Sequence, residues 1–331
     1  MKYVFITNPV SGKQSTKLID RIEEAFIAKG RGEQFICEYT RKKGHGAEIA
    51  AEYSHRYGGG CLIIACGGDG TVHEISSVLV HTDTPMIILP FGTGNDFSKK
   101  LYGRKPDPEK VARQFGFLDG SPKFVCKKID VGRIDDGYFI GVMSFGFDTL
   151  VEIAGGKISK KLPFLGSFSY KLGLLFTLFG KKEFNFHVEL DIVRADGSIE
   201  KLDKDIDFTL MAVCNSSYYG GGFCPAPLAN ISDGIFELCI AESCNALDVI
   251  RLAPYYTKGT AAEKSKKVTL SNVVSGRITA ADGSEFTRNC DGENSPVGSV
   301  SFEICHKALR ICIPCPDGVA VADKISVAAA K

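Results

Sequence analysis

The chain has 331 residues, of which 44% are hydrophobic and 24% are charged, and its formal net charge is +1. This length favours two domains of ordinary size, and the composition is that of a globular protein, neither disordered nor membrane-spanning. Nucleic-acid-binding domains usually carry a marked basic excess, so the small net charge predicts no nucleic-acid partner.

The N-terminus and the cysteines bear on the cellular compartment. The apolar run in MKYVFITNPVSGK is too short for a secretory signal and predicts a first strand, so we expect a cytoplasmic protein. Twelve cysteines then predict reduced, buried thiols rather than disulfides. The CIPC segment from Cys312 to Cys315 is a single pair, and Cys305 and His306 lie at poor spacings, so zinc is the less favoured alternative.

The first hundred residues alternate β-rich runs with segments of helical period. Strands are predicted at residues 2–7, 34–40, 61–66 and 85–90, and helices at 15–29, 47–57, 71–80 and 96–101. This alternation predicts right-handed βαβ units, and therefore an α/β domain with a parallel sheet covered by helices. Ligands bind such sheets at the carboxyl ends of the strands, where NPVSGK, GGDGT and FGTGND lie.

The pattern changes after about Pro122. Short β-rich runs are then separated by DDG, ADGS, SDG and CDGE turns, which predicts a mainly antiparallel second domain rich in hairpins. We place the first domain at residues 1–127 and the second at 128–315, with a helical insertion at about 155–182. The tail, 316–331, has little packing information and is predicted to be partly disordered.

The GGDGT turn has the properties of a phosphate site. Gly67, Gly68 and Gly70 permit positive φ and close approach of ligand oxygens to backbone N–H groups. Thr71 is placed to cap the following helix, whose first amides bind phosphate. Asp69 would repel phosphate unless it holds a cation or a backbone donor, and Mg²⁺ is the simplest explanation. For this turn alone, a plain glycine turn with a local Asp69 hydrogen bond is an equally good interpretation.

A second turn of the same kind strengthens the phosphate hypothesis. FGTGNDF also follows an apolar strand, supplies two glycines and Thr93, and opens a helix with Asn95 and Asp96. NPVSGK is not a Walker A loop, because Thr7 stands where the first glycine is required and Gln14 follows the lysine. For Lys13, a phosphate contact and a solvated loop position stay equally open.

These segments together resemble the diacylglycerol kinase catalytic family, which includes sphingosine and ceramide kinases and the soluble bacterial lipid kinases. The resemblance rests, in chain order, on NPVSGK, GGDGTVHE, PFGTGNDFSKKL, IDVGR, SFGFD, YYGGGFCPAPLANISDGIFEL and CDGE. It covers nearly the whole chain. The resemblance implies an N-terminal nucleotide domain akin to NAD kinase, a C-terminal β-sandwich, and an active site in the cleft between them.

The resemblance also implies the residues of the ATP site and the catalytic groups. Glu293 of CDGE is implied as the general base toward a lipid hydroxyl, with Mg²⁺ near Asp69 and Asp96. Nucleotide contacts are implied along four strand ends, at Asn8, Pro9, Lys13, Thr40, Gly67, Gly68, Asp69, Gly70, Thr71, Gly92, Thr93 and Asn95.

A structural Mg²⁺ site is implied in the second domain. Asp233 of SDG and the backbone carbonyls of Asn230 and Ile235 match that site of the bacterial enzymes. Departures are mild: Cys290 precedes DGE where valine is frequent, and Asn230 stands where an apolar residue is common. The implied ligand at residue 230 is the backbone carbonyl, so the metal site can form with either an asparagine or an apolar side chain there.

Residues 157–182 combine apolar side chains with lysines at both ends, and the longest uncharged run is too short to span a bilayer. Lysines would meet anionic headgroups while Leu162, Phe164, Leu165 and Phe168 enter the interface. A core-packed helix pair is an equally good interpretation. The membrane hypothesis predicts transient peripheral association with the inner face of the membrane.

The predicted function is ATP-dependent phosphorylation of a lipid hydroxyl, most simply diacylglycerol giving phosphatidic acid. NAD kinase is the principal alternative, although such enzymes use an asparagine–glutamate pair and the chain has no Asn-Glu dipeptide. A non-catalytic lipid- or nucleotide-binding module is the second alternative. The acceptor lipid does not follow from the sequence, and an exposed sheet edge offers a route to a homodimer.

Overall fold

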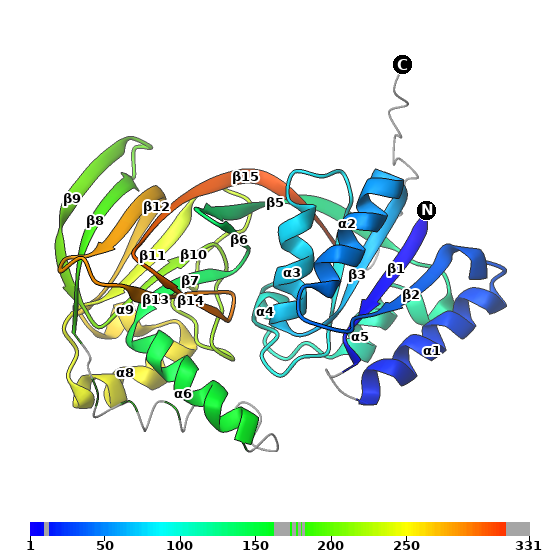
Figure 1. The fold of residues 1–331 in the computed structure, drawn as a ribbon, viewed down its shortest axis with the longest axis horizontal. Helices are drawn as coiled ribbons and strands as arrows, with labels where there is room; N and C mark the ends of the chain where they lie inside the picture. Colours follow the sequence, from blue (N-terminus) through cyan, green and yellow to red (C-terminus); the bar gives the residue numbers. More distant parts are fainter. Residues whose placement is uncertain (10–12, 162–172, 174–176, 178–179, 181–182, 316–331) are drawn as a thin grey trace.

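The structure is a computed structural model of residues 1–331, and it describes residues 1–9, 13–161, 173, 177, 180 and 183–315. The chain forms two lobes that are connected by long strands (Figure 1). No helix within these ranges is long and apolar enough to cross a membrane. The predicted tail and most of the predicted 157–182 segment lie outside the described residues.

The N-terminal lobe alternates strands and helices as predicted. Its parallel strands follow the spatial order β2-β1-β3-β4. The elements are β1 (Lys2–Thr7), α1 (Lys13–Ala28), β2 (Phe35–Tyr39), α2 (His45–Tyr57), β3 (Cys61–Gly67), α3 (Asp69–Leu79), β4 (Met86–Pro90), α4 (Asp96–Tyr102) and α5 (Pro108–Gln114), with 3₁₀ turns at Gly32–Gln34, Gly58–Gly60 and Phe117–Asp119.

Alternating side chains of the strands build two cores, one on each face of this sheet. Val4 and Ile6 of β1 pack with α2 and α3, whereas Tyr3 and Phe5 pack with α1 and α5. Because strand side chains alternate in direction, a run of consecutive apolar residues fits a strand that is covered on both faces. The sheet is therefore a rigid base for the turns at its carboxyl edge.

The C-terminal lobe is mainly antiparallel, as predicted. Its elements are β5 (Phe124–Ile134), β6 (Gly137–Phe139), β7 (Val142–Gly146), α6 (Phe147–Lys161), β8 (Phe184–Val193), β9 (Ile199–Phe208), β10 (Leu210–Cys214), β11 (Phe236–Ala241), α8 (Ala246–Lys258), α9 (Ala261–Lys264), β12 (Val268–Ala280), β13 (Phe286–Cys290), β14 (Glu293–Val297) and β15 (Ser299–Pro314). The first helix after β7, α6, begins at Phe147, earlier than the predicted insertion at 155.

Two strands belong to both lobes. β15 pairs with β12 in the C-terminal lobe and with β4 in the N-terminal lobe, and it runs antiparallel to β5 over most of its length. Figure 1 shows β15 arching from one lobe to the other. Leu309 and Ile311, near its end, are buried in the core under α2 and α3. The last residues of the described chain therefore complete the first lobe.

A disulfide joins the same two strands, between Cys126 of β5 and Cys312 of β15. The prediction that all twelve cysteines are reduced is wrong for this pair, because the strand register places the two residues opposite each other. The sulfur of Cys312 is thereby taken, so CIPC does not offer the thiolate pair that the zinc alternative required. The other ten cysteines are free thiols.

We expect the Leu309→Ala substitution to lower the free energy of unfolding by about 2 to 5 kcal/mol, because it opens a cavity in the first lobe's core. Urea denaturation followed by circular dichroism measures this change. Val125→Ala, on the partner strand at a side chain that is 37% exposed, is the matched control and should cost far less. Equal losses for the two variants would contradict the assignment of β15 to the N-terminal core.

Candidate active site

A cavity of about 410 Å³ lies between the lobes, at the carboxyl edge of the parallel sheet. From the N-terminal lobe it is lined by both predicted glycine turns, and from the C-terminal lobe by residues 140–142, 218–221 and 291–293. Asp69, Asp96 and Glu293 all line it. The structure thus brings together the three predicted catalytic residues, which are far apart in the sequence.

The first glycine turn joins β3 to α3. The helix begins at Asp69 with Gly68 as its N-cap, so the prediction that Thr71 caps the helix is wrong. Thr71 instead lies in the first helical turn, where its hydroxyl accepts a hydrogen bond from the Asn8 amide at 3.4 Å. A side chain on Gly67 would overlap Thr71. The backbone amides of the first turn are therefore exposed to the cavity without a side-chain cap.

Close packing between the two glycine turns explains their composition. A side chain on Gly92 would overlap the Cα atom of Gly68, and one on Gly94 would overlap the Asp69 carboxylate. None of the glycines at positions 67, 68, 70, 92 and 94 has φ in the left-handed region. Close approach of neighbouring atoms, rather than an unusual backbone angle, is what requires glycine at positions 67, 92 and 94.

Asp69 links the two turns. Its Oδ1 accepts the backbone N–H of Asp96 at 2.7 Å, at the start of α4. Burial, followed by the nearby charge of Asp96, raises the pKa of Asp69 to about 7. A cation at this position would relieve both effects, since it would neutralise the two carboxylates. The local hydrogen bond and a cation site are therefore compatible.

Asp96 connects the lobes. Its Oδ2 accepts the backbone N–H of Gly221 at 2.8 Å, and its Oδ1 binds the ammonium group of Lys99 at 2.6 Å. Both oxygens are thus engaged by the protein. Of the two acidic residues predicted to lie near Mg²⁺, Asp69 is therefore the better candidate for a metal ligand. Asp96 stabilises the contact between the lobes.

Glu293 begins β14 and faces the first glycine turn. Its Oε1 lies 3.3 Å from the position that a Cβ atom on Gly70 would take. Its Oε2 binds the ammonium group of Lys43 at 2.5 Å, on the loop after β2. The side chain is 38% exposed, so it contacts both the cavity and solvent. The role of Lys43 was not predictable from local sequence patterns, because this pair joins residues 250 positions apart.

Asp291 is a site residue whose part the sequence did not reveal, although it lies within the CDGE motif. Its carboxylate accepts the backbone N–H groups of Ile140, Gly141 and Val142 at 2.8 to 3.1 Å. It also pairs with Nδ1 of His73 on α3 at 3.2 Å. Burial disfavours the charged imidazole, but the Asp291 carboxylate outweighs it and raises the pKa of His73. Asp291 thereby fixes the turn that presents Glu293.

The remaining predicted nucleotide contacts lie along the same sheet edge. The backbone N–H of Asn8 bonds to the carbonyl of Cys66 at 3.0 Å, and that of Thr40 bonds to the carbonyl of Thr7 at 3.0 Å. Lys13 begins α1 and Pro9 is exposed at the end of β1. Thr93 lines the cavity, and Asn95 fixes its own turn by accepting the Gly92 N–H at 3.0 Å. The strand ends thus form one continuous edge.

The predicted structural metal site lies outside the cavity. The Asp233 carboxylate accepts the N–H of Ile235 at 3.2 Å, and the side-chain oxygen of Asn230 accepts from Ser232. Within the described ranges, no three His, Cys, Asp or Glu side chains group as a metal centre. One carboxylate completed by backbone carbonyls is a donor set that Mg²⁺ accepts, so these residues fit the predicted role.

Comparison with known proteins identifies the family of this architecture. Residues 2–127 match the diacylglycerol kinase catalytic domain, and residues 141–313 match the YegS C-terminal NAD kinase beta sandwich-like domain. The second match alone spans more than half of the chain. The chain belongs to this diacylglycerol kinase and YegS family of lipid kinases. The resemblance predicted from the motifs is confirmed.

Relatives with this family's names come from several bacteria. Diacylglycerol kinase of Mycobacterium tuberculosis is 31% identical over 214 residues, which is 61% of this chain and 61% of that protein's length. Diacylglycerol kinase of Bacillus subtilis is 27% identical, covering 76% and 78%. A probable lipid kinase YegS-like protein of Chromohalobacter salexigens is 34% identical, covering 56% and 55%.

Solved structures confirm the fold. A Bacillus anthracis crystal structure described as a diacylglycerol kinase superposes with a TM-score of 0.64 at 18% identity, over 96% of this chain and 98% of that one. A second structure from that organism gives 0.68 at 21% identity, over 95% and 98%. The predicted fold class, an α/β domain followed by an antiparallel sandwich-like domain, is confirmed.

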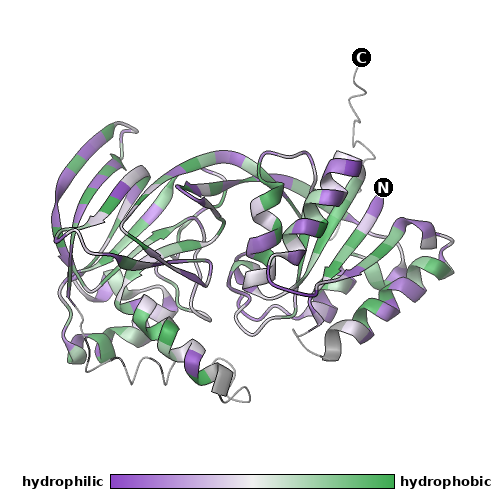
Figure 2. Ribbon diagram, viewed as in Figure 1, coloured by the Kyte–Doolittle hydropathy of each residue, from purple (hydrophilic) through white to green (hydrophobic). Residues whose placement is uncertain are grey.

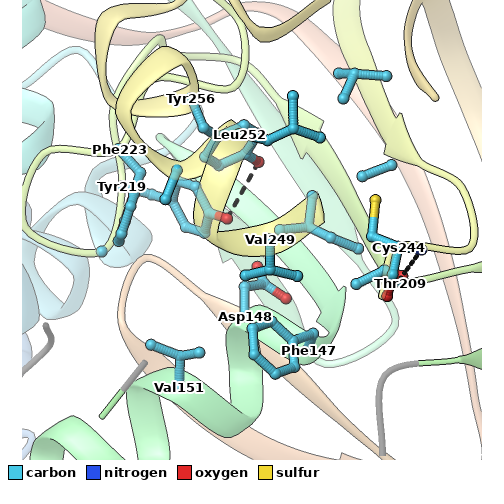
Figure 3. Close-up of a pocket in the computed structure, with 15 residues that line it drawn as sticks. Phe147, Asp148, Val151, Thr209, Tyr219, Phe223, Cys244, Val249, Leu252 and Tyr256 are labelled. Carbon is cyan, nitrogen blue, oxygen red and sulfur yellow. Dashed lines mark hydrogen bonds between the residues drawn. The ribbon is translucent and has the colours of Figure 1, made fainter. Parts of the chain in front are cut away.

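A second, apolar pocket opens beside the cleft of this family member. Tyr219 and Gly220 line both cavities, so the two are adjacent. Figure 3 shows side chains of α6 and α8 pointing into it, with the Tyr219 and Tyr256 hydroxyls 3.2 Å apart. Its lining consists of Phe147, Asp148, Val151, Thr209, Leu210, Tyr219, Gly220, Phe223, Ala241, Cys244, Val249, Leu252, Ala253, Tyr256 and Val268.

Asp148 is the one ionisable carboxyl group in this apolar lining. Its Oδ1 accepts the Thr149 N–H at 2.9 Å, whereas its Oδ2 is buried and has no donor of the described chain within hydrogen-bonding distance. Burial raises the pKa of Asp148 to about 7, and the more distant hydroxyls of Ser144 and Tyr219 offset this effect only in part. At neutral pH, an ionised Asp148 therefore costs stability.

We expect the stability of Asp148→Asn relative to the wild type to rise by about 1 to 4 kcal/mol between pH 5 and pH 8. The folded-state pKa of Asp148, about 7, lies above its ordinary value of 3.8, so this group's contribution to stability is full below 3.8 and is lost progressively as pH rises to about 7. Thermal unfolding at both pH values measures the difference.

Asp136→Asn is the control, because its expected effect on stability at pH 8 has the opposite sign. The hydrogen bond from Arg288 lowers the pKa of Asp136, so this variant should lose stability at pH 8 relative to the wild type. A melting temperature that Asp148→Asn shifts equally at pH 5 and pH 8 would contradict the assignment of a buried, ionising carboxylate.

Proposed function

We propose that the protein transfers the γ-phosphoryl group of ATP to the hydroxyl group of a lipid, with diacylglycerol as the first candidate acceptor and phosphatidic acid as its product. One contact carries the proposal: the Glu293 carboxylate of the C-terminal lobe lies against Gly70 of the N-terminal glycine turn. A base beside a phosphate-type turn is the arrangement that phosphoryl transfer to a hydroxyl requires.

The two glycine turns are the proposed phosphate ligands. Their backbone N–H groups line the cleft, and the positive end of α3 begins at Asp69. Asn8, Thr40 and Lys13, at the neighbouring strand ends, are proposed for the rest of the ATP. Close packing of the turns makes this cradle rigid, so its amides would need no rearrangement when charge develops.

Mg²⁺ is the proposed metal, with the Asp69 carboxylate as its protein ligand and Asp96 beside it. When bound, the ion would neutralise phosphate charge during the transfer. A second, structural Mg²⁺ is proposed at Asp233 and the carbonyls of Asn230 and Ile235. Both are oxygen donor sets of the kind that Mg²⁺ prefers.

Glu293 is the proposed general base. Its partially exposed carboxylate is held beside the cleft by Lys43, and the Asp291 turn fixes the backbone from which it extends. The acceptor hydroxyl would lose its proton to Glu293 while its oxygen attacks the γ-phosphorus, and ADP would leave. Charge neutralisation and proton removal thus come from opposite lobes.

The apolar pocket beside the cleft is the proposed site for the hydrocarbon of the acceptor. Its cavity of about 90 Å³ holds only a small part of an alkyl chain. None of the α8 residues is fully buried, so we infer that the helix moves outward to admit a full chain. The headgroup would then emerge at Tyr219 and Gly220, next to Glu293.

Relatives of both names inform the choice of acceptor. The Mycobacterium tuberculosis and Bacillus subtilis proteins are named diacylglycerol kinase, whereas others are named only YegS-like lipid kinase. Diacylglycerol is therefore the first acceptor to test, and other lipid alcohols follow. A cytoplasmic location, transient contact with the inner face of the membrane, and a homodimer through an open edge such as β2 remain proposals.

NAD kinase is the competing assignment, since it shares the GGDG turn. The apolar pocket favours a lipid over NAD, because a dinucleotide offers no hydrocarbon chain to fill it. ADP release from ATP and Mg²⁺, measured with dispersed diacylglycerol, other lipid alcohols and NAD in parallel, tests the proposal. Turnover with NAD alone would overturn it, and ligand binding without any ADP release would point to a non-catalytic module.

We expect Glu293→Gln to lower the turnover number by about 10² to 10⁴, because it removes the proton acceptor and little else. Initial rates of ADP release with the best acceptor measure this effect. ATP affinity, measured by calorimetry, should change little, since Glu293 belongs to the opposite lobe.

Glu48→Gln is the matched control. Glu48 also forms an exposed ion pair with a loop lysine, Lys42 at 2.8 Å, but it does not line the cleft. This variant should keep full turnover. A Glu293→Gln variant that retains the wild-type rate would exclude Glu293 as the base.

A further inference from the structure

Helix α8 is apolar on two opposite faces. Val249, Leu252 and Tyr256 point inward and line the apolar pocket, as Figure 3 shows. Leu247 and Ile250 point outward and are 62% and 53% exposed. A surface helix normally has one polar face, so a second apolar face needs an explanation.

The outward face follows a regular helical spacing. Six of the seven exposed residues of α8 recur at intervals of three and four positions, which places them in one stripe: Leu247, Ile250, Arg251, Pro254, Tyr255 and Lys258. Figure 2 shows both hydrophobic (green) and hydrophilic (purple) residues on this helix, at the edge of the C-terminal lobe. The stripe contains two cations and no acidic residue.

The helix does not depend on packing of this stripe for its formation. Asn245 and Asp248 form a reciprocal capping box at its start, and Gly259 ends it in a left-handed conformation. The acidic residue of α8 itself, Asp248, is paired with Lys267 at 2.6 Å. The exposed apolar side chains therefore lie on a helix whose two ends are well capped.

We propose that this stripe of α8 docks onto the surface of a bilayer containing anionic lipids. Leu247, Ile250 and Tyr255 would enter the interfacial region, and Arg251 and Lys258 would meet lipid phosphates. The opposite face of the same helix lines the pocket proposed for the hydrocarbon of the acceptor. Docking would thus place that pocket beside the source of its ligand. Only this last step, the placement of the acceptor pocket beside the membrane, rests on the proposed function.

A bilayer explains the stripe better than a second copy of the chain does. The helix has 13 residues and is about 20 Å long, so one stripe of it is small beside the roughly 800 Å² per partner of a stable protein interface. A symmetric contact through the stripe would also bring together two copies of its cations, Arg251 and Lys258, for which the described part of the chain shows no ion pair, and like charges repel. Anionic headgroups neutralise them instead.

Flotation of the full-length protein with vesicles tests the proposal without any need for catalysis. We expect the wild type to bind vesicles of phosphatidylglycerol and phosphatidylcholine, and Leu247→Glu/Ile250→Glu to bind at least tenfold less. Ile199→Glu is the matched control, because Ile199 is 59% exposed on β9, away from α8, and it should bind as the wild type does. Equal binding by all three proteins would overturn the proposal.

A second variant guards against a folding defect. Arg251→Glu leaves every apolar residue in place and should weaken binding to anionic vesicles while leaving the melting temperature unchanged. Unaltered binding by this variant would overturn the electrostatic part of the proposal. A wild-type dimer that Leu247→Glu/Ile250→Glu converts to a monomer, seen by analytical ultracentrifugation, would assign the stripe to self-association and overturn the docking surface.

Kinase activity separates this inference from the proposed function. With a water-soluble, short-chain diacylglycerol, Leu247→Glu/Ile250→Glu should turn over as the wild type does, whereas with vesicle-embedded diacylglycerol it should be at least tenfold slower. Equal loss with both substrates would contradict a docking role. If the wild type phosphorylates no lipid at all, the proposed function fails while the flotation result still decides the docking surface.

Discussion

The close contact of the two glycine turns is the constraint on which the site depends. A Cβ atom on Gly92 would overlap the Cα atom of Gly68, and one on Gly68 would lie only 3.1 Å from the Cα atom of Gly92. Asp69 accepts a hydrogen bond across this contact. A rigid parallel sheet, covered by helices on both faces, holds the two strand ends from which the turns extend. The amides that face the cleft are therefore fixed before any ligand arrives, which is what electrostatic preorganisation requires.

The second lobe completes this site because three contacts cross the cleft. Asp96 reaches Gly221, His73 reaches Asp291, and Lys43 reaches Glu293. β5 and β15 run through both lobes, so the orientation of one lobe on the other rests on continuous strands as well as on side chains. The proposed base and the turns proposed to hold phosphate therefore belong to different lobes. The apolar pocket proposed for the acceptor lies within the C-terminal lobe, beside the cleft.

Local patterns predicted most of the fold and the first half of the site. Apolar runs and glycine turns located β1 to β4 and their helices, because these depend on neighbouring residues. Contacts between distant residues were not predictable in the same way. The Cys126–Cys312 disulfide, the Lys43–Glu293 pair and the burial of Asp148 Oδ2 without a hydrogen bond in the described chain all depend on how distant segments fold together. The family resemblance supplied Glu293, which spacing alone would have left as an ordinary turn carboxylate.

The central claim is that donor and acceptor meet in one cleft, with the phosphate turns on one side and Glu293 on the other, so that transfer occurs in a single in-line step. The stereochemistry at phosphorus tests it most directly. ATP that is chiral at the γ-phosphorus through isotopes of oxygen and sulfur would be incubated with diacylglycerol, and the configuration of the product would be determined by NMR. We expect inversion of configuration at phosphorus. Retention, which requires two successive transfers through the protein, would contradict it.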